Sequence, residues 1–244
     1  MRRPTAVITG GTRGIGRATA LRLAREGWDV VLGYAHDDEA AAATAAEVQA
    51  LGAECRTIRA DLTGEDGIDE LFDGAIAWAG RIDGVVNNAG ATLHIGTLAE
   101  TPVPTIRRVI DLNLTSAVLV ARRAVKDLGE GGVLVNVSSG AATTGSPGEY
   151  VHYAAAKAGV DALTKGLAIE VAPQGLRVVG VAPGTIETRV HADAGDPGRP
   201  ERVAARHPTG RIGRPEEVAA VIAFVLSEQA SYVAGTTVRV AGGA

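Results

Sequence analysis

Short apolar segments alternate with longer amphipathic segments along the whole chain. We expect strands near residues 5–9, 29–34, 54–59, 82–87, 132–137, 177–182 and 236–240. Helical patterns lie between them at 14–26, 38–51, 66–79, 103–128, 151–172 and 215–227. Segments such as "GVLVNV" and "RVVGVA" are apolar on both faces, as in a parallel sheet that helices cover on both sides. The alternation predicts a doubly wound, Rossmann-type α/β fold with a mostly parallel, seven-stranded sheet.

We expect a single domain over residues 1–244. This length is sufficient for one large core, and neither a repeat nor a break in composition interrupts residues 1–185. Residues 186–214 differ, because they are polar and rich in Gly, Pro and Arg. We interpret this segment as a mobile lid over a substrate site rather than as a linker to a second domain.

Charge and composition argue against several classes of partner. The net charge is −4 and no basic run stands out, so we expect no nucleic-acid partner. The chain has no signal-peptide pattern and no apolar run of membrane-spanning length, so we expect no membrane partner and a cytoplasmic location. Cys55 is the only cysteine, which excludes an internal disulfide and predicts a packed core thiol.

A glycine-rich turn, "TGGTRGIG" (9–16), separates the first expected strand from the first expected helix. Glycines let a backbone approach a diphosphate closely, and a helix N-terminus presents free N–H groups and a partial positive charge. The strand–turn–helix context therefore predicts a nucleotide site. The alternative is a flexible loop, and the spacing is G-x-x-x-G-x-G rather than G-x-G-x-x-G.

The turn resembles the T-G-x-x-x-G-x-G loop of the short-chain dehydrogenase/reductase family. Four further segments typical of that family follow in its order: "NNAG" (87–90), "NVSS" (136–139), "YAAAK" (153–157) and "APGTIET" (182–188). "GRIGRPEEVA" and "YVAGTTVRVAGG" extend the resemblance over the whole chain, which is most similar to 3-oxoacyl-carrier-protein reductases and related ketoreductases. Residues expected at the nicotinamide cofactor are Gly10, Thr12, Arg13, Gly14, Ile15, Gly16, Tyr34, His36, Asp61, Leu62, Asn88, Ala89, Gly90, Tyr153, Lys157, Pro183, Gly184, Ile186 and Thr188.

The chemistry of Tyr153 and Lys157 supports catalysis independently. They are four residues apart on an expected helix and so share one face, whereas Tyr150 has Ala154 at that distance. A nearby ammonium favours the phenolate, so we expect a lowered pKa for Tyr153, which could then protonate a ketone oxygen. A solvated helix face is the alternative for such a pair, but Lys157 lies in a small, apolar run.

The resemblance implies two further catalytic residues. Ser139, rather than the adjacent Ser138, would hydrogen-bond the substrate oxygen, and Asn113 would support a water-linked proton relay through Lys157. Ser139 and Tyr153 are 14 residues apart, one more than is usual among close relatives. The extra residue falls in "GSPGEYVHY", which we expect to line the substrate pocket.

The end of the second expected strand bears on cofactor preference. An acidic residue there would bind the ribose hydroxyls of NADH and repel a 2′-phosphate, but the matching position holds Tyr34. Arg13 and His36 could contact a phosphate, so we expect NADPH to be preferred. NADH remains possible, because a shifted turn could bring Asp37 or Asp38 inward.

We expect an enzyme that reduces a ketone, such as a 3-oxoacyl or polyketide-like compound, to a secondary alcohol. A housekeeping 3-oxoacyl-carrier-protein reductase is one alternative, and a non-catalytic NADP(H)-binding sensor or scaffold is another. Carrier-protein reductases dock an acidic carrier on two arginines, and those positions here hold Glu130 and Gln174. We therefore expect a substrate that need not be carrier-bound, although Arg122, Arg123 and Lys126 could compensate.

Relatives of this kind are commonly tetramers. The resemblance implies that the helices at 103–128 and 151–172 and the C-terminal strand pack against symmetry mates. Alanine-rich helix faces such as "YAAAKAGVDALTKGLAIEVA" would allow close helix–helix contact, so we expect a homotetramer with D2 symmetry and a dimer as second choice. We expect no metal site, because the histidines show no paired ligand spacing. His94, His152, His191 and His207 are expected at the surface or in loops, with His94 and His152 as candidates for substrate contact.

Overall fold

The computed structural model describes residues 2–244. One seven-stranded sheet of order β3-β2-β1-β4-β5-β6-β7 organises them, and every neighbouring pair is parallel. The strands are β1 (Thr5–Thr9), β2 (Asp29–Tyr34), β3 (Cys55–Arg59), β4 (Ile82–Asn87), β5 (Leu128–Val137), β6 (Arg177–Pro183) and β7 (Thr237–Val240). The predicted single-domain, Rossmann-type fold is confirmed.

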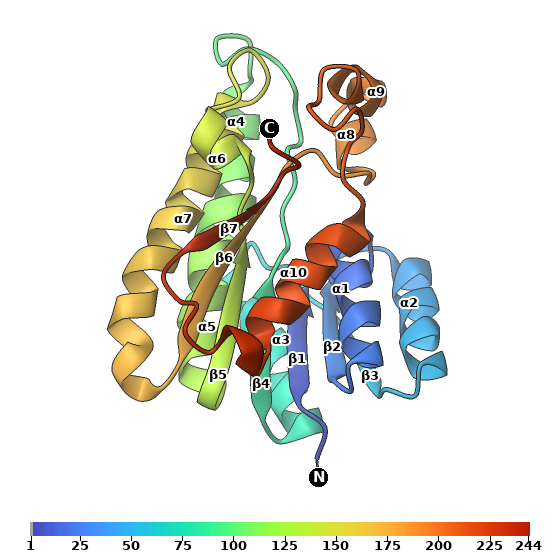
Figure 1. Ribbon diagram of the computed structural model, residues 1–244, viewed down its shortest axis with the longest axis vertical. Helices are drawn as coiled ribbons and strands as arrows, with labels where there is room; N and C mark the ends of the chain where they lie inside the picture. The colour runs from blue at the N-terminus through green and yellow to red at the C-terminus, as the bar shows by residue number, and fades with distance from the viewer. Residues whose placement is uncertain (1) are drawn as a thin grey trace.

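Helices cover both faces of the sheet (Figure 1). One face carries α1 (Gly14–Arg25), α2 (Asp38–Ala50) and α10 (Pro215–Leu226); the other carries α3 (Glu65–Ala79), α5 (Ser116–Asp127) and α7 (Val151–Val171). Shorter helices are α4 (Val103–Ile110), α6 (Ala141–Thr144), α8 (Val190–Asp193) and α9 (Arg199–Ala204), with 3₁₀ turns at Ala172–Gln174 and Glu228–Ala230.

Alternating strand side chains build two apolar layers. In β1, Ile8 packs into the layer beneath α1 and α10, whereas Val7 packs into the layer beneath α3 and α5. Leu32 and Val31 of β2 divide in the same way, and all four side chains are fully buried. Burial on both faces explains why these strands are continuous apolar runs.

The strand order reverses at β1, which pairs in parallel with β2 on one side and with β4 on the other. Ligands of doubly wound sheets bind at this switch point, outside the carboxyl ends of the strands. The glycine turn, the NNAG segment and the residues after β5 all leave the sheet at that edge. The segment 186–214, which the sequence predicts to be a lid and which contains α8 and α9, lies beyond the same edge (Figure 1).

The segment 103–128 departs from the single regular helix expected from its sequence. A five-residue π-helical turn, Asp111–Thr115, separates α4 from α5. Such turns insert one extra residue per turn and occur frequently at functional sites. Asn113 lies at the centre of this one.

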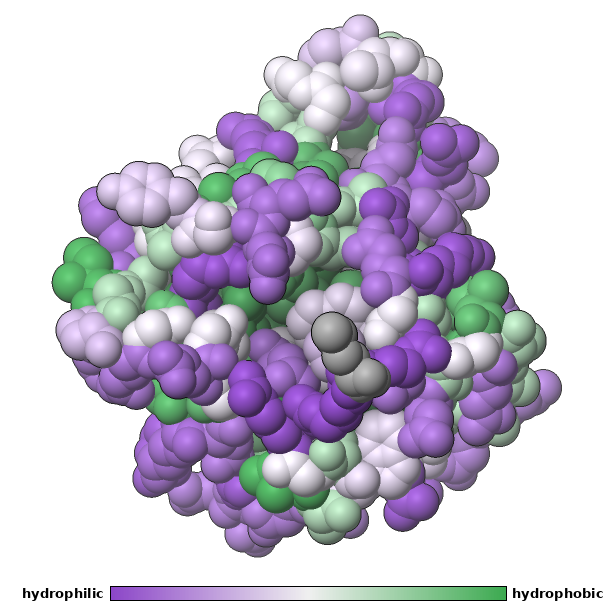
Figure 2. Space-filling view, turned by 60° about the horizontal axis from the view of Figure 1, so that its bottom comes forward, coloured by the Kyte–Doolittle hydropathy of each residue, from purple (hydrophilic) through white to green (hydrophobic). Residues whose placement is uncertain are grey.

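Figure 2 shows the opposite end of the molecule, where the strands begin. Hydrophilic side chains dominate this surface, and the apolar areas on it are small and separate. Within residues 2–244, no helix combines the length and apolar character that crossing a membrane would require.

Candidate active site

The glycine turn has the geometry of a diphosphate cradle. Gly10 and Gly14 have φ of 61° and 51°, in the left-handed region that favours glycine. A Cβ on Gly16 would lie 2.1 Å from the backbone oxygen of Gly10, so only glycine fits there. Helix α1 begins at Gly14 without an acidic residue in its first turn or a side-chain cap. Its free N–H groups therefore favour an anion.

The NNAG segment after β4 is hydrogen-bonded to this cradle. The Thr9 hydroxyl accepts from the backbone N–H groups of Asn88 (2.8 Å) and Ala89 (2.9 Å). The Asn88 side chain donates to the backbone oxygens of Thr9 (2.9 Å) and Gly10 (3.2 Å). The segment and the turn thus form one rigid unit that could hold the cofactor.

The end of β2 presents a cluster of charged groups. Tyr34 donates a hydrogen bond of 2.8 Å to Asp38, and this bond raises the pKa of Tyr34. Arg13 pairs with Asp37 at 3.5 Å, and both side chains are partly exposed. Asp37 also caps α2 by accepting from the N–H of Ala40. His36 is exposed beside them.

Sequence reasoning missed Arg59. The register of β2 against β3 sets Arg59 opposite Tyr34, and its guanidinium lies 3.9 Å from Asp38. It also donates to the backbone oxygen of Ala35. Only the sheet order reveals this neighbour, since 25 residues of chain separate it from Tyr34.

The remaining predicted cofactor residues surround the same edge. Asp61 is exposed, and hydrogen bonds from Thr63 lower its pKa, with His36 close enough to add to the effect. Thr188 approaches the glycine turn, because a Cβ on Gly14 would lie 3.2 Å from its methyl group. The others are buried or partly buried there: Thr12, Ile15, Leu62, Pro183, Gly184 and Ile186.

Tyr153 and Lys157 lie in the first two turns of α7. The Lys157 ammonium is buried, 5.8 Å from the centroid of the Tyr153 ring, and donates to the backbone oxygen of Val137 (2.9 Å). Val137 ends β5, and Ser139 follows two residues later with its hydroxyl accepting from the N–H of Ala141 (3.1 Å). Strand β5 and helix α7 therefore bring together three of the side chains predicted to be catalytic.

The two adjacent serines have different surroundings. The Ser138 hydroxyl is buried and donates to the backbone oxygen of Lys157 (3.2 Å), so it stabilises the fold. Ser139 lies close enough to Tyr153 to lower the pKa of that phenol. Ser139 is thus the serine beside Tyr153.

Asn113 is held by its side-chain amide in the π-helical turn. It donates to the backbone oxygens of Ala91 (2.8 Å) and Val109 (2.9 Å) and accepts from the N–H of Ala91. A Cβ on Gly90 would lie 2.5 Å from the Asn113 oxygen and 3.4 Å from the Lys157 nitrogen. Asn113 and Lys157 therefore both approach Gly90 closely, and a larger residue at position 90 would clash with the Asn113 side chain.

The expected lowering of the Tyr153 pKa is wrong for this arrangement. Burial raises the pKa of Tyr153 to about 12 and outweighs the contact with Ser139. Burial likewise lowers the pKa of Lys157 to about 8. The ammonium lies over the ring and donates to Val137, so desolvation dominates both groups.

A buried polar chain fixes the strands beneath the site. The Asn87 amide donates to the Asn136 side chain (3.0 Å), which donates to the Thr164 hydroxyl (3.0 Å). These residues come from β4, β5 and α7, and all are buried. Such a satisfied network sets the position of α7 relative to the sheet.

Two of the histidines contradict the expected surface or loop placement. His152 in α7 and His191 in α8 are buried, and burial lowers the pKa of each. His94 lies close enough to His152 to lower its pKa further.

The lone cysteine, Cys55, is predicted from the sequence to be a packed core thiol. It packs against the core, and burial raises the pKa of its thiol to about 12. Residues 2–244 hold no cluster of three metal-ligating side chains.

The expected docking positions lie away from the site within the subunit. Glu130 is near the start of β5 and Gln174 precedes β6, so both are at the amino ends of strands. Ser139 follows the carboxyl end of β5, at the opposite edge of the sheet from Glu130. Arg122 pairs with Glu65, and Arg123 pairs with Asp69, Asp73 and Asp127. Within one subunit, Glu130 and Gln174 therefore lie at the opposite edge of the sheet from Ser139, and the expectation of a substrate that need not be carrier-bound stays a prediction.

Comparison with known proteins agrees with this geometry. A family model described as enoyl-(acyl carrier protein) reductase matches residues 10–244. The chain belongs to the short-chain dehydrogenase/reductase family. It is an oxidoreductase that acts on CH–OH or C=O groups, and the family binds nicotinamide cofactors.

Curated relatives of this family member carry different activities in their names. The uncharacterized oxidoreductase YgfF of Escherichia coli is 43% identical over 98% of this chain and 98% of its own length. A 3beta-hydroxysteroid dehydrogenase 1 of Eggerthella lenta is 39% identical, over 98% of this chain and 92% of its own. A 3-oxoacyl-[acyl-carrier-protein] reductase of Synechocystis is also 39% identical, over 98% and 95%.

Solved structures share the whole fold. A dehydrogenase/reductase from Sinorhizobium meliloti has a TM-score of 0.93 and 33% identity, covering 100% of this chain and 95% of its own. A short-chain dehydrogenase from Burkholderia cenocepacia in complex with NADP has a TM-score of 0.91 and 32% identity, covering 99% and 97%.

Proposed function

We propose that this protein is an NADPH-dependent ketoreductase that converts a ketone to a secondary alcohol. The observation that carries the proposal is the convergence of Ser139, Tyr153, Lys157 and Asn113 beside the glycine cradle. A protein that only sensed the cofactor would have no need of this set. Bound NADPH would supply the hydride, and the protein would supply the proton and hold the carbonyl.

Tyr153 would act as the general acid. With a pKa raised to about 12, its phenol keeps its proton at neutral pH and can donate it to the carbonyl oxygen. The Ser139 hydroxyl would hydrogen-bond the same oxygen and stabilise its developing charge. Lys157, with a pKa lowered to about 8, releases a proton more readily than an ordinary lysine and could reprotonate Tyr153. We assign Asn113 to the relay that feeds Lys157.

The cofactor residues would be those of the cradle and its surroundings. The glycine turn and the N-terminus of α1 would hold the diphosphate, with Thr188 beside the turn. Asp61 and the backbone of residues 88–90 would line the adenine side of the cofactor. Preference for NADPH is supported by Tyr34 at the position of the NADH-specific carboxylate. Arg13, His36 and Arg59 lie beside Tyr34 and would contact the 2′-phosphate.

We propose a ketone substrate that does not depend on an acyl carrier. The names of the relatives span a steroid dehydrogenase and a carrier-protein reductase, so the shared machinery accepts different substrates. The support within this chain is the lengthened loop before Tyr153 and the segment 186–214, which we interpret as a substrate lid.

Assembly as a homotetramer is proposed from the unpartnered apolar surface. Val118 on α5, Ile169 on α7 and Phe224 on α10 are exposed, and Tyr232 before β7 is fully exposed. Strand β7 is the last of the sheet, so one of its edges lacks a strand neighbour in the subunit.

We propose a cytoplasmic location, as expected from the sequence. The lone cysteine, Cys55, is half-buried and unpaired, which accords with a reducing compartment.

A ketone screen tests the proposal. The purified protein is assayed with NADPH and NADH against a panel of steroid ketones, short aliphatic ketones and 3-oxoacyl thioesters, with Tyr153→Phe as the matched control. Ketone-dependent oxidation of NADPH by the wild type alone is expected. Tight binding of NADPH without turnover of any ketone or alcohol would instead support the non-catalytic sensor.

A further inference from the structure

We propose that Arg199 is a positioning residue that holds the lid, residues 186–214, on the loop before α7 and thereby sets Tyr150 against Tyr153. This inference rests on the proposed function, in which Tyr153 is the general acid. Arg199 opens α9 within the lid, and Glu149 and Tyr150 directly precede α7. The contact therefore joins the lid to the start of the helix that carries Tyr153 and Lys157.

The Arg199 guanidinium makes a multidentate contact with this loop. Its nitrogens donate to the two carboxylate oxygens of Glu149 at 2.7 and 3.3 Å and to the hydroxyl of Tyr150 at 2.6 Å. The guanidinium also lies 5.2 Å from the centroid of the Tyr150 ring. A planar fork that binds a carboxylate and an aromatic ring together is specific to arginine, so lysine would not replace it.

Tyr150 carries the contact to the active site. Its ring meets the Tyr153 ring edge to face, with centroids 5.5 Å apart and an interplanar angle of 88°. This is a preferred geometry for aromatic pairs, so a shift of one ring disturbs the other. The hydroxyl of Tyr150 is bonded to Arg199, and the position of its ring therefore depends on the lid.

Glu149 also joins a third segment. Its backbone oxygen accepts from the N–H of Gly96 (2.6 Å), in the loop after the NNAG segment. Leu93 in that loop and Ser146 in the loop before α7 are the only non-glycine residues of 2–244 with positive φ. Strained backbone of this kind persists only where its surroundings hold it. Glu149 connects both strained loops, and Arg199 holds Glu149.

The Arg199 contact differs from an ordinary surface ion pair. The Arg199 side chain is 8% exposed, the least of any arginine in the ion pairs of residues 2–244. Three residues along α9, Arg202 pairs with Asp196 but remains 60% exposed. Exposed pairs contribute little, whereas breaking a buried pair leaves a desolvated charge without its partner. In the Arg199–Glu149 pair the guanidinium is the buried group, because the Glu149 side chain is 38% exposed, whereas in the Arg202–Asp196 pair the guanidinium is exposed.

The Arg199 contact would couple substrate entry to the position of Tyr150. If the lid opens to admit substrate, Arg199 leaves Glu149 and Tyr150, and the ring of Tyr150 loses its anchor beside Tyr153. The Tyr153 side chain would then be held in its orientation by Tyr150 only when the lid is closed. Closure and proton transfer would be coupled through one side chain.

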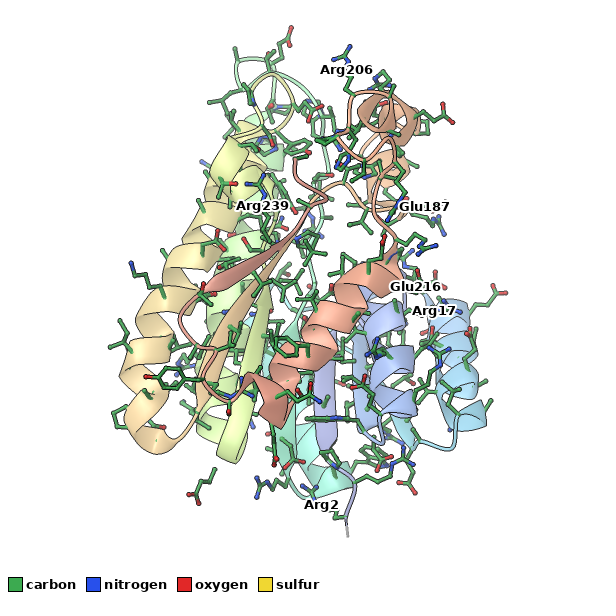
Figure 3. The ribbon with its side chains drawn as sticks, viewed as in Figure 1. Arg2, Arg17, Glu187, Arg206, Glu216 and Arg239 are labelled. Carbon is green, nitrogen blue, oxygen red and sulfur yellow. The ribbon has the colours of Figure 1, made fainter. Side chains whose placement is uncertain are left out.

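The test compares Arg199→Met with Arg206→Met. Arg206 is exposed at the outer end of the same lid and serves as the matched control (Figure 3). We expect Arg199→Met to lower kcat at least about tenfold, as for loss of a charge-assisted hydrogen bond, with a smaller change in KM and in the dissociation constant of NADPH. Arg206→Met should stay within about twofold of wild type. Equal kinetics of the two variants would overturn the proposal.

Two further measurements distinguish loss of the Arg199 contact with Glu149 and Tyr150, which we call the latch, from a general loss of folded structure. Glu149→Gln and Arg199→Met should be strongly non-additive in kcat, and Tyr150→Phe should lower kcat while keeping its ring contact with Tyr153. Hydrogen exchange of the free protein should rise in 146–150 and 190–204 for Arg199→Met and not for Arg206→Met. Exchange needs no substrate, so an inactive wild type would refute the ketoreductase alone. Unchanged exchange in 146–150 would refute the latch alone.

Discussion

The ammonium of Lys157 lies over the ring of Tyr153, 5.8 Å from its centroid, and donates its hydrogen bond to Val137 rather than to the phenol. The pair therefore does not form a preset phenolate. Burial raises the pKa of Tyr153, which therefore keeps its proton, and lowers the pKa of Lys157, which therefore releases its proton more readily. These directions suit the proposed roles of Tyr153 as proton donor and Lys157 as the group that reprotonates it.

Replacing Tyr153 by Phe should remove the general acid and leave the fold intact. We expect kcat to fall at least about 10²-fold, because loss of a general acid has this effect, while the dissociation constant for NADPH stays near that of wild type. Steady-state rates and fluorescence titration of NADPH measure the two quantities. Turnover like that of wild type would refute the assignment of Tyr153.

Replacing Lys157 by Met should abolish reduction but stabilise the fold at pH 7. The folded-state pKa of Lys157 is about 8, below its ordinary value of 10.5, so burial of the charged form lowers stability at pH values below 8. We expect the free energy of unfolding to rise by up to about 3 kcal/mol at pH 7. Denaturant titrations should show this gain shrinking as the pH rises from 8 towards 10.5, where wild-type Lys157 is neutral in both states. A loss of stability at pH 7 would contradict the buried-charge account.

NADPH should give a higher kcat/KM than NADH. Arg13→Ala and Arg59→Ala should each lower kcat/KM with NADPH by about tenfold, the effect of one charge-assisted hydrogen bond, and leave the value with NADH nearly unchanged. Arg22→Ala removes an exposed pair with Glu26 elsewhere on α1 and serves as the control. Equal or better kcat/KM with NADH would overturn the preference.

A short thioester mimic should be reduced about as well as the same 3-oxoacyl chain on a carrier protein. The family resemblance sets Glu130 and Gln174 at the positions of the carrier-docking arginines, and Arg122 and Arg123 are already paired with carboxylates. Rates with both substrates are compared at low and high salt. A strong preference for the carrier-bound chain that salt weakens would show that this reading is wrong.

Light scattering at micromolar concentration should give the mass of a tetramer. Ile169 is 72% exposed on α7, and Ile169→Glu should lower the mass to that of a dimer or monomer because it places a charge in an apolar interface. Glu170→Gln, at the neighbouring exposed position, should leave the mass unchanged. A monomer mass for wild type would refute the assembly.

Periodicity in the sequence determined the elements of this protein. Strands β1, β2 and β4 have the predicted bounds, because short apolar runs between turn residues are typical of buried parallel strands. The glycine turn and the Tyr153–Lys157 spacing could also be read locally. In each case the information lies within a few neighbouring residues.

Only the tertiary structure decided how residues distant in sequence meet. Sheet register placed Arg59 beside Tyr34, chain folding buried His152 and His191, and strand direction placed Glu130 at the end opposite Ser139. Desolvation reversed the expected pKa shift of Tyr153. The Arg199–Tyr150 contact spans 49 residues of chain. Burial, register and desolvation depend on the whole packed chain, and no local pattern of residues encodes them.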